Sequence, residues 1–361
     1  METPYLLLDA AIAKRNIARM AEKARASNVL FRPHFKTHQC AEIAQWYRAE
    51  GVEAITVSSL KMVQYFAANG WTDITLAFPV NRLDHQAIDA LAATINFNIV
   101  VEDVDTIRFM EENLSHPVGV YLKIDTGYGR TGVDAEDFDT LVVLMDALKE
   151  TRNLIFIGLL THAGHTYHAG SVDEILEIQK KSFMQLRAIK TFLFDKFPLM
   201  QLSYGDTPSC SLMAGFAGVD EVRPGNFVFY DLTMVQLGAC SLTDIAVALV
   251  APVVAVHAQR HEAVIHGGAV HLSKDQLVAA DGSSHYGLVV AFDGEKWLVD
   301  QPLGTISKLS QEHGIISLNE AGESLVKPGM LVAVLPVHSC MTANAMKSYV
   351  LTSGEILPMM P

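Results

Sequence analysis

The sequence predicts an α/β fold, a (β/α)8 barrel of the TIM type, followed by a C-terminal all-β domain. Up to about residue 240, short β-rich apolar runs alternate with amphipathic helical patterns, and this alternation is typical of a parallel sheet. Beyond that point the long helical periods end and β-type runs take over. We therefore expect a barrel over residues 10–240 and a β domain over residues 241–361, to which residues 1–9 are added.

The elements follow from these patterns in chain order. A strand is expected at Tyr5–Leu8 and a helix at Ala10–Arg25. Eight barrel strands, the number that closes such a barrel, are expected at Leu30–Phe35, Ala54–Val57, Ile74–Phe78, Phe97–Val101, Gly119–Ile124, Ile155–Leu160, Met200–Tyr204 and Val219–Arg223. Helices between them are expected at Cys40–Ala49, Lys61–Ala68, Arg82–Ala93, Glu136–Leu148 and Val172–Phe194. The β domain is expected to contain Ile245–Val256, Glu262–His266, Tyr286–Phe292, Lys296–Val299, Gly304–Leu309, Gly314–Leu318, Met330–Pro336 and Ala345–Leu357.

Composition excludes several classes of partner. The chain has a net charge of −13 and no basic block, so we expect neither nucleic acid nor an anionic membrane as partner. The sequence contains no uncharged apolar run of about 18 residues, the length that a membrane span would need. The four cysteines stand singly, without a CxxC pair, which favours a reducing compartment. Together with an acidic segment Met1–Pro4 that lacks a signal-type apolar stretch, this predicts a cytoplasmic globular protein.

Polar residues cluster behind the predicted barrel strands, where the chemistry of this fold gathers. The first strand ends in His34, Lys36, Thr37 and His38. Partial burial and neighbouring positive charge would disfavour the ammonium form of Lys36, so that its amine becomes available for Schiff-base chemistry. On the octapeptide alone, a surface lysine in a basic loop is the simpler reading. The residues that follow the later strands in the sequence favour a functional role for Lys36 instead.

Two small loops are suited to an anion. Gly205–Ser209 and Gly225-Asn226 follow the seventh and eighth strands, the usual place of a phosphate site in this architecture. Ordinary turn chemistry would explain each loop by itself.

Four further side chains suit a flat heteroaromatic ring. Arg130 and Arg223 can pair with acidic oxygens or a ring nitrogen, and His162 and Tyr167 can stack on a ring or hydrogen-bond to it. A lone histidine is usually structural. Taken with Lys36 and the two loops, however, the set describes a site for pyridoxal 5'-phosphate (PLP).

The β domain adds a possible metal site at Pro336–Cys340, at the end of an apolar strand pattern. Positions i and i+2 of a strand face the same way, so His338 and Cys340 can meet one ion. Imidazole and thiolate suit zinc, and substrate or water would complete the shell of an open, catalytic site. A packed cysteine beside a structural histidine is the commoner alternative.

The sequence resembles the fold-type III PLP enzymes of the alanine racemase group, and more closely the D-serine dehydratase / D-threonine aldolase family. The resemblance spans nearly the whole chain and rests on motifs in a fixed order. They are Arg-Pro-His-x-Lys-Thr-His at Arg32, Lys-Ile-Asp-Thr-Gly-x-x-Arg-x-Gly at Lys123, Thr-His-x-Gly at Thr161, Arg-Pro-Gly-x-Phe at Arg223, Gln-Glu-His-Gly at Gln311 and His-x-Cys-x-Thr at His338.

The resemblance implies a role for each candidate. Lys36 would bind the cofactor covalently, Arg130 would lie near its phenolic oxygen and His162 would stack on its ring. Either Tyr167 or Arg223 would approach the pyridine nitrogen. The phosphate would be held by two loops, one running from Gly205 to Thr207 and the other formed by Gly225 and Asn226. Tyr204 would lie close by. His338 and Cys340 would bind Zn2+ or another divalent metal, and a homodimer is implied.

The same resemblance ranks the reactions. Aldolases of the family carry aspartate two residues after the metal histidine, so Cys340 favours a zinc-dependent lyase that dehydrates a D-3-hydroxyamino acid such as D-serine to a 2-oxo acid and ammonia. A D-threonine-type aldolase, a racemase or epimerase with Tyr286 as its second base, and a non-catalytic PLP-binding protein are the alternatives. One segment departs from the family: His266–Ser273 reads His-Gly-Gly-Ala-Val-His-Leu-Ser where members often read Asp-Ala-Gly-Ser-Lys-Ala-Leu-Ser.

Overall fold

The chain folds into two compact units in the computed structural model, which describes residues 3–279 and 282–361. The barrel unit consists of Arg19–Lys36 and Ala44–Gly225. The β unit consists of the residues up to Ala18, of Thr37–Ile43 and of Asn226–Pro361. Among the described residues, no helix is long and apolar enough to cross a membrane.

Within residues 19–225, all of which the structure describes, eight parallel strands follow the order β2-β10-β9-β8-β6-β5-β4-β3. A parallel bridge from His34 to Thr56 joins the two edges, with Phe35 N donating to Thr56 O at 2.9 Å. The predicted (β/α)8 barrel is therefore confirmed. The strands are β2 (Leu30–Phe31), β3 (Ala54–Val57), β4 (Asp73–Pro79), β5 (Asn96–Val101), β6 (Val118–Asp125), β8 (Leu154–Leu160), β9 (Gln201–Tyr204) and β10 (Glu221–Val222), with a short β7 (Val133–Asp134) beside β6.

The first barrel strand is shorter than expected. Regular pairing covers only Leu30–Phe31, instead of Leu30–Phe35, and continues as single contacts through Arg32 and His34. Pro33 explains the break, because proline has no N–H to donate to the neighbouring strand. The chain thus leaves the barrel wall just before Lys36.

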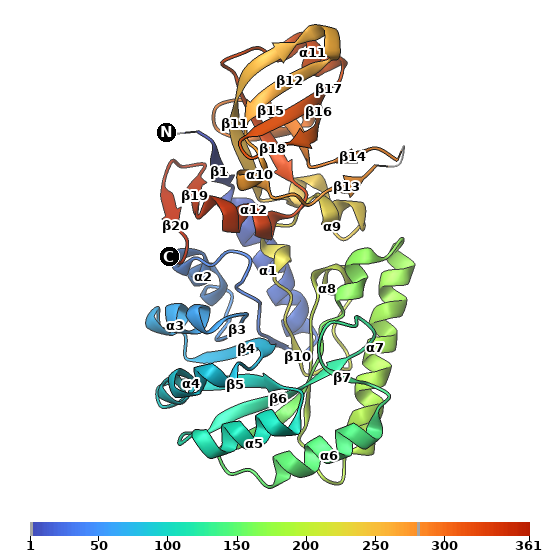
Figure 1. Ribbon diagram of the computed structural model, residues 1–361. Helices are drawn as coiled ribbons and strands as arrows, with labels where there is room; N and C mark the ends of the chain where they lie inside the picture. The colour runs from blue at the N-terminus through green and yellow to red at the C-terminus, as the bar shows by residue number, and fades with distance from the viewer. Residues whose placement is uncertain (1–2, 280–281) are drawn as a thin grey trace. The chain divides into compact units, whose positions relative to one another are not determined.

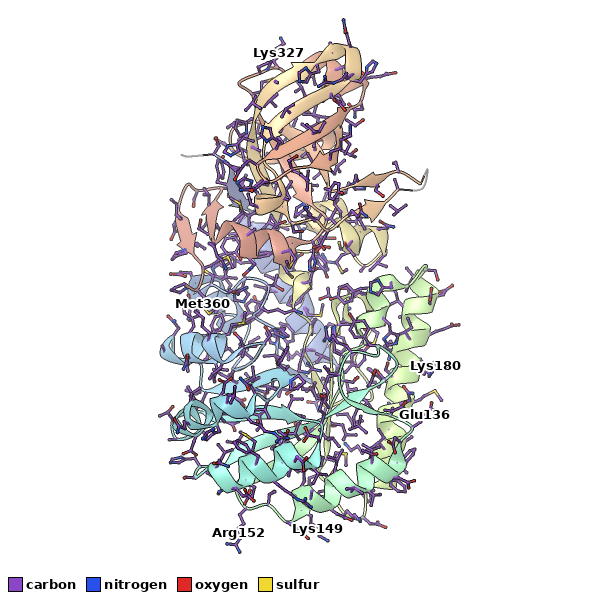
Figure 2. All side chains as sticks on the ribbon, in the orientation of Figure 1. Glu136, Lys149, Arg152, Lys180, Lys327 and Met360 are labelled. Carbon is purple, nitrogen blue, oxygen red and sulfur yellow. The ribbon has the colours of Figure 1, made fainter. Side chains whose placement is uncertain are left out.

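Helices connect the strands and lie outside them (Figure 1). They are α1 (Ala10–Ala26), α2 (Ala41–Arg48), α3 (Leu60–Ala68), α4 (His85–Ala92), α5 (Val104–Asn113), α6 (Phe138–Lys149), α7 (Val172–Phe192) and α8 (Thr207–Leu212). The predicted helices are present within a few residues. α5 had not been singled out, although Asp103 caps it by accepting from Thr106 N at 2.7 Å. Charged side chains such as Glu136, Lys149 and Lys180 are on the outer surface, as Figure 2 shows.

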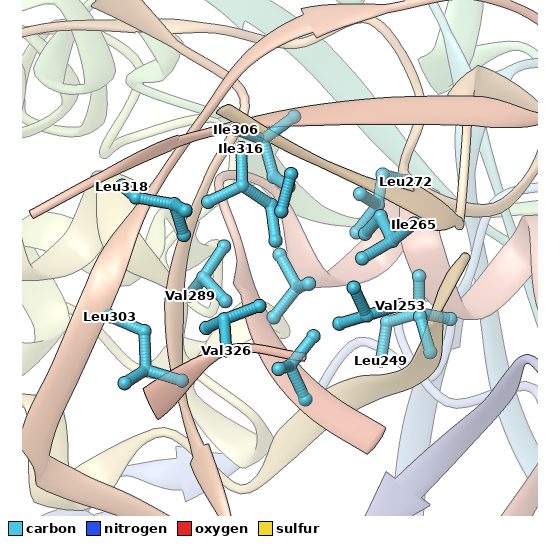
Figure 3. Packing of buried hydrophobic residues seen from close by; sticks show 14 residues of the cluster. Leu249, Val253, Ile265, Leu272, Val289, Leu303, Ile306, Ile316, Leu318 and Val326 are labelled. Carbon is cyan, nitrogen blue, oxygen red and sulfur yellow. The ribbon is translucent and has the colours of Figure 1, made fainter. Parts of the chain in front are cut away.

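In the β unit, nine of the described strands form one sheet in the order β12-β17-β16-β15-β18-β11-β1-β19-β20. Since β12 also pairs with β11, the first six of these strands form a closed ring. They are β1 (Tyr5–Leu8), β11 (Val247–His257), β12 (Glu262–His266), β15 (Gly287–Phe292), β16 (Trp297–Leu309), β17 (His313–Leu318), β18 (Leu331–Pro336), β19 (Ser348–Leu351) and β20 (Ile356–Pro358). β1 pairs antiparallel with β11, and Leu8 lies opposite Val247. Apolar side chains from the ring, among them Leu249, Ile306 and Val334, fill its interior (Figure 3).

Short helices interrupt the β unit at α9 (Leu232–Gln236), α10 (Ala269–Leu272), α11 (Glu320–Leu325) and α12 (Ser339–Met346), and a small β13–β14 hairpin adds Leu277–Val278 and Ser284–His285. Two local predictions were wrong here. His338 and Cys340 do not lie on a strand: β18 ends at Pro336, His338 caps α12 and Cys340 belongs to its first turn. The strand expected from Ala345 begins only at Ser348, after Lys347 ends α12 in the left-handed conformation.

A glycine contact tests the barrel packing. A Cβ on Gly158 would lie 2.0 Å from Gln201 O of the neighbouring strand β9. We expect Gly158→Ala to destabilise the cofactor-free protein by about 2–3 kcal/mol, because backbone on both sides has to move. Gly170→Ala, whose Cβ would be 3.5 Å from Glu174 Oε2, is the matched control. Equal midpoints of chemical unfolding for both variants would contradict this packing.

Candidate active site

Lys36 leaves the barrel wall together with His34. Lys36 N donates to His34 Nδ1 at 3.3 Å. Burial, and then the positive charges of Lys36 and Arg223, hold the pKa of His34 well below its ordinary value, so the ring is neutral. Lys36 is itself exposed and not partly buried as expected. The amine is therefore open to a small molecule.

His162 follows β8, and a hydrogen bond to a backbone carbonyl fixes the orientation of its ring. Its Nδ1 lies 2.6 Å from Gly205 O, and because a carbonyl only accepts, Nδ1 carries the proton and Nε2 keeps its lone pair. Burial and the charges of Lys36 and Arg130 lower the pKa of His162 well below its usual range, against the opposing effect of the Gly205 carbonyl. His162 is thus a neutral, oriented ring close to Lys36.

Tyr128 connects Arg130 with His162. The Arg130 guanidinium carbon lies 5.0 Å from the centre of the Tyr128 ring, and the Tyr128 and His162 rings meet edge to face at 5.9 Å. Gly164 allows this approach, because a Cβ there would lie 2.4 Å from Tyr128 Cε1. The sequence analysis assigned no role to Tyr128.

Arg223 is buried and rigidly held at the ends of three strands. Its Nε donates to Ser203 Oγ at 2.6 Å, and its Nη2 donates to Thr161 O. Glu221 Oε1 lies 3.8 Å away and balances the charge. Burial lowers the pKa of Arg223 while Glu221 raises it. The guanidinium therefore sits in the ring of strand ends that also carries His34 and His162.

Tyr167 lies at a different place from Arg223. Its hydroxyl accepts from Thr207 N at 3.3 Å, at the start of α8. The two residues between which the sequence could not choose are therefore distinguished by their contacts. Arg223 is built into the strand ends, and Tyr167 contacts the Gly205–Ser209 loop.

That loop is tightly fixed and holds a buried hydroxyl without a partner. The hydroxyl of Tyr204 lies 2.9 Å from Ser209 Oγ, and Asp206 accepts from Ser209 N at 2.7 Å. Gly205 leaves no room for a side chain, since a Cβ would lie 3.0 Å from the Arg223 backbone. Thr207 Oγ1 is buried and makes no hydrogen bond within the described residues.

The second predicted phosphate loop is divided between the units. Gly225 ends the barrel unit, whereas Asn226 begins the last segment of the β unit. The Asn226 amide donates to Asp231 Oδ2 at 2.6 Å and to Ser339 Oγ at 3.1 Å, and it lies 3.6 Å from Cys340 Sγ. Its side-chain nitrogen is therefore engaged next to Cys340.

His338 and Cys340 are brought together in the β unit by α12. The His338 Nδ1 lies 3.0 Å from Asp275 Oδ2, and Thr37 Oγ1 lies 3.2 Å from Cys340 Sγ. Burial lowers the pKa of His338, but Asp275, Cys340 and Asp231 raise it, to about 11 overall. The acidic groups around the ring make this an environment that favours a cation. No sequence signal marked Asp275 or Asp231, because their positions depend on turns distant in the chain.

Lys123 is a further buried group that the sequence analysis left without a role. Burial, together with the charges of Arg223 and Arg130, lowers the pKa of this amine to about 7. The barrel cluster thus gathers cations and neutral rings, which suits a ligand with negative charge.

Comparison with known proteins decides the family. The profile of the alanine racemase N-terminal domain matches residues 8–232. The chain belongs to this family of fold-type III PLP enzymes. A second profile, the putative serine dehydratase domain, matches residues 246–352, which cover most of the β unit.

Individual relatives cover almost the whole chain. D-threo-3-hydroxyaspartate dehydratase of Delftia sp. is 29% identical over 361 residues, which span 97% of this chain and 93% of the relative. Its solved structure matches with a TM-score of 0.89 over 99% of this chain and 97% of that one. D-serine dehydratase of Dictyostelium discoideum is 27% identical over 97% of this chain and 93% of its own. D-threonine aldolase of Arthrobacter sp. is 25% identical but covers 64% of this chain and 62% of its own.

The neutral histidines predict acid sensitivity. His34 and His162 have pKa values lowered in the folded chain, whereas in the unfolded chain they titrate near 6.5. Below pH 6.5 the unfolded state therefore binds more protons, and stability falls by up to about 1.4 kcal/mol per pH unit and ring. His162→Phe should flatten the loss of stability between pH 6.5 and 5 in cofactor-free protein, as measured by chemical unfolding. An unchanged slope would show that His162 titrates normally.

Proposed function

We propose that this protein is a PLP- and zinc-dependent lyase that dehydrates a D-3-hydroxyamino acid, with D-serine as the first candidate, to a 2-oxo acid and ammonia. The observation that carries the proposal is the arrangement of Lys36 with His34, His162 and Arg223 at the strand ends of one barrel. The β unit supplies His338 and Cys340. The dehydratases among the relatives support the same reaction.

The barrel residues fit PLP. The unpartnered Thr207 hydroxyl and the compact Gly205 loop suit a phosphate, and Tyr167 and Tyr204 contact the same loop. Arg223 only donates hydrogen bonds, so a pyridine nitrogen beside it would be unprotonated. We assign the ring nitrogen to Arg223 because Arg223 is held at the strand ends, whereas the Tyr167 hydroxyl is hydrogen-bonded to Thr207 N. Lys36 would hold PLP through its side-chain amine, and PLP would supply the electron sink for the pair left at the substrate Cα.

The chain's own groups then have distinct tasks. The Lys36 amine, besides holding the cofactor, would take the proton from the substrate Cα. His162 presents a flat, neutral ring whose orientation is fixed by Gly205 O. Arg130, held over Tyr128, offers a positive charge to the phenolic oxygen. Because His34 and His162 stay neutral, they add no positive charge that would compete for this oxygen.

The donor set of the β unit fits a divalent metal. Asp275 accepts from His338 Nδ1–H, so a metal would displace the proton from His338 Nε2 and bind that nitrogen, and Cys340 would bind as a thiolate. Zinc at this pair would supply Lewis-acid activation of the leaving β-hydroxyl. One relative, D-threo-3-hydroxyaspartate dehydratase, has been solved as a mutant in a metal-free form, which supports a metal in this family. Thr37, which contacts Cys340, directly follows Lys36 in the chain.

We also propose a role for each unit, a cellular compartment and an oligomeric state. The barrel unit would act as the cofactor-binding domain and the β unit as the metal-carrying domain; the last segment of the β unit begins at Asn226 and not near residue 240 as the sequence suggested. A cytoplasmic, reducing environment would keep Cys340 available as a ligand, since none of the cysteines forms a disulfide in the described part of the chain. A homodimer is the expected assembly, and its mass in solution is a direct check.

The proposal is tested by product analysis with D-serine and L-serine on the PLP- and zinc-loaded protein. Pyruvate and ammonia from D-serine alone are expected. Pyruvate from L-serine alone would overturn the stereochemical assignment, and an absence of pyruvate from both would exclude serine as substrate.

Retro-aldol cleavage is the second candidate, because aldolases also occur among the relatives. Cys340→Asp would test it: a rise in glycine and aldehyde at the expense of the 2-oxo acid indicates that residue 340 selects the reaction.

Racemisation is less well supported. Tyr286, its candidate second base, packs against the apolar core of the β unit.

The phosphate assignment makes a separate prediction. Thr207→Val should weaken PLP binding about 10-fold, because one hydrogen bond to a charged group is lost. Ser211→Ala, in the same helix and with its hydroxyl bonded to Thr207 O, is the control. Equilibrium titration with PLP measures both, and equal affinities would remove Thr207 from the phosphate site.

A further inference from the structure

Two histidines and a glutamate form a cluster in the β unit to which the proposed lyase reaction assigns no role. His266 ends β12, His271 lies in α10, and Glu312 lies in the turn between β16 and β17. Their ligand atoms all lie within 4.8 Å of one another. Three side chains from three different elements thus converge on one point.

The backbone holds the cluster firmly. His266 lies opposite His313 in the β12–β17 ladder, and Gly267 N donates to Glu312 O at 3.0 Å. Further along, Ala269 N donates to Ser310 O at 2.8 Å. Gly268 allows the close approach, since a Cβ there would lie 2.3 Å from Gln311 O. The segment carrying both histidines is therefore fastened to the turn that carries Glu312.

The distances fit a tetrahedral ion. Glu312 Oε2 lies 3.4 Å from His266 Nε2 and 3.8 Å from His271 Nε2. Bonds of about 2.0–2.2 Å in a tetrahedron put neighbouring ligand atoms about 3.3–3.6 Å apart. The two rings are nearly perpendicular, at 89°, with centres 5.5 Å apart. The ligand atoms of the two histidines lie within 4.8 Å of each other, so rotation of the side chains has to bring them up to about 1.5 Å closer.

The exposure of the three side chains leaves a position for water. His271 is 15% exposed, whereas His266 and Glu312 are 44% and 46% exposed. Burial lowers the pKa of His271 and His266 lowers it further, against the effect of Glu312, so the ring is neutral and able to ligate. Three protein ligands on one side and solvent on the other describe an open site.

We propose that His266, His271 and Glu312 bind a divalent cation, zinc by preference, at a second site separate from His338 and Cys340. Two imidazoles and a carboxylate are a donor set that zinc accepts. In the metal-free chain Gly268 N donates to His271 Nδ1 at 3.1 Å, which places the ring proton on Nε2 beside Glu312. The cation takes the place of that proton, the proton moves to Nδ1, and the Gly268 hydrogen bond is given up.

The cation would brace α10 against the β16–β17 turn. α10 is followed by Ser273 and Asp275, whose side chains hydrogen-bond to each other at 3.1 Å, and Thr342 of α12 donates to Leu272 O at 3.2 Å. The second site therefore acts structurally, on the segment that leads to Asp275.

The test titrates zinc alone into metal-stripped, PLP-loaded protein that carries both His338→Ala and Cys340→Ala, so that only the new site remains. Calorimetry should detect one bound equivalent, and zinc should raise Tm. Adding His271→Ala should weaken binding at least 10-fold and abolish the rise in Tm. His313→Ala, an exposed neighbour on β17, is the matched control and should bind as before.

Two results would overturn the site: no zinc bound by the protein that keeps His266, His271 and Glu312, or equal binding with and without His271. Glu312→Gln, which keeps the shape of the side chain, should also weaken binding and guards against misfolding of the His271→Ala protein. Turnover is not a readout here, so the outcome is independent of whether the proposed dehydration is correct.

Discussion

Lys36→Ala should abolish turnover, by a factor of about 10³ or more, and remove the visible absorbance of lysine-bound PLP. Lys36 is proposed to hold the cofactor and to take the Cα proton. Lys123, which also belongs to the barrel cluster, is buried within β6 and does not offer a flexible amine in its place. Lys36→Arg should fail as well, because a guanidinium keeps the charge but is not a nucleophile at neutral pH.

The control is Lys180→Ala, a change of an exposed lysine on the outside of α7 (Figure 2). It should leave both absorbance and turnover unchanged. Retention of the absorbance band by Lys36→Ala, with mass spectrometry of the borohydride-reduced protein placing the cofactor on another lysine, would refute the assignment of the barrel site.

Cys340→Ala should separate the two halves of the proposed site. The barrel residues are untouched, so PLP binding and its absorbance should persist. Loss of a thiolate ligand should weaken zinc binding at the His338 pair and lower turnover by about 10² or more, since the remaining donors cannot hold the ion. The measurements are kcat and the zinc content at the pair, and Cys240→Ala is the matched cysteine control.

Full turnover of Cys340→Ala in the presence of a chelator would contradict the metal role of the pair. Asp275→Asn would then be uninformative for catalysis. If the pair does bind the metal, the same change should lower metal affinity roughly 10–100-fold, because the acceptor that orients the His338 ring loses its negative charge.

The barrel could be predicted because its signals are local. Each of β3 (Ala54–Val57), β5 (Asn96–Val101) and β8 (Leu154–Leu160) is an apolar, β-rich run followed by a polar turn, and the rule that chemistry gathers at strand ends then pointed to Lys36 and His162. The predicted strand Leu30–Phe35 proved too long for a local reason too. Pro33 interrupts the hydrogen bonds to the neighbouring strand, although the apolar sequence pattern continues through it.

The surroundings of the candidate site were beyond sequence reasoning. Nothing in the sequence places Asp275 beside His338, 63 residues later, or the Asn226 amide beside Asp231 and Ser339. The strand argument expected His338 and Cys340 to lie close together, as they do, but for the wrong reason, because a helix start and not strand alternation brings the two together. Contacts made by turns and caps depend on the completed fold.

The measurement that tests the central claim most directly is the product formed from D-threonine by the PLP- and zinc-loaded protein. This substrate gives a different product in each candidate reaction. The account predicts 2-oxobutanoate and ammonia. Glycine and acetaldehyde would contradict it, since the bond broken would then be Cα–Cβ, and an isomer of threonine would mean that the proton is returned to Cα without loss of the hydroxyl.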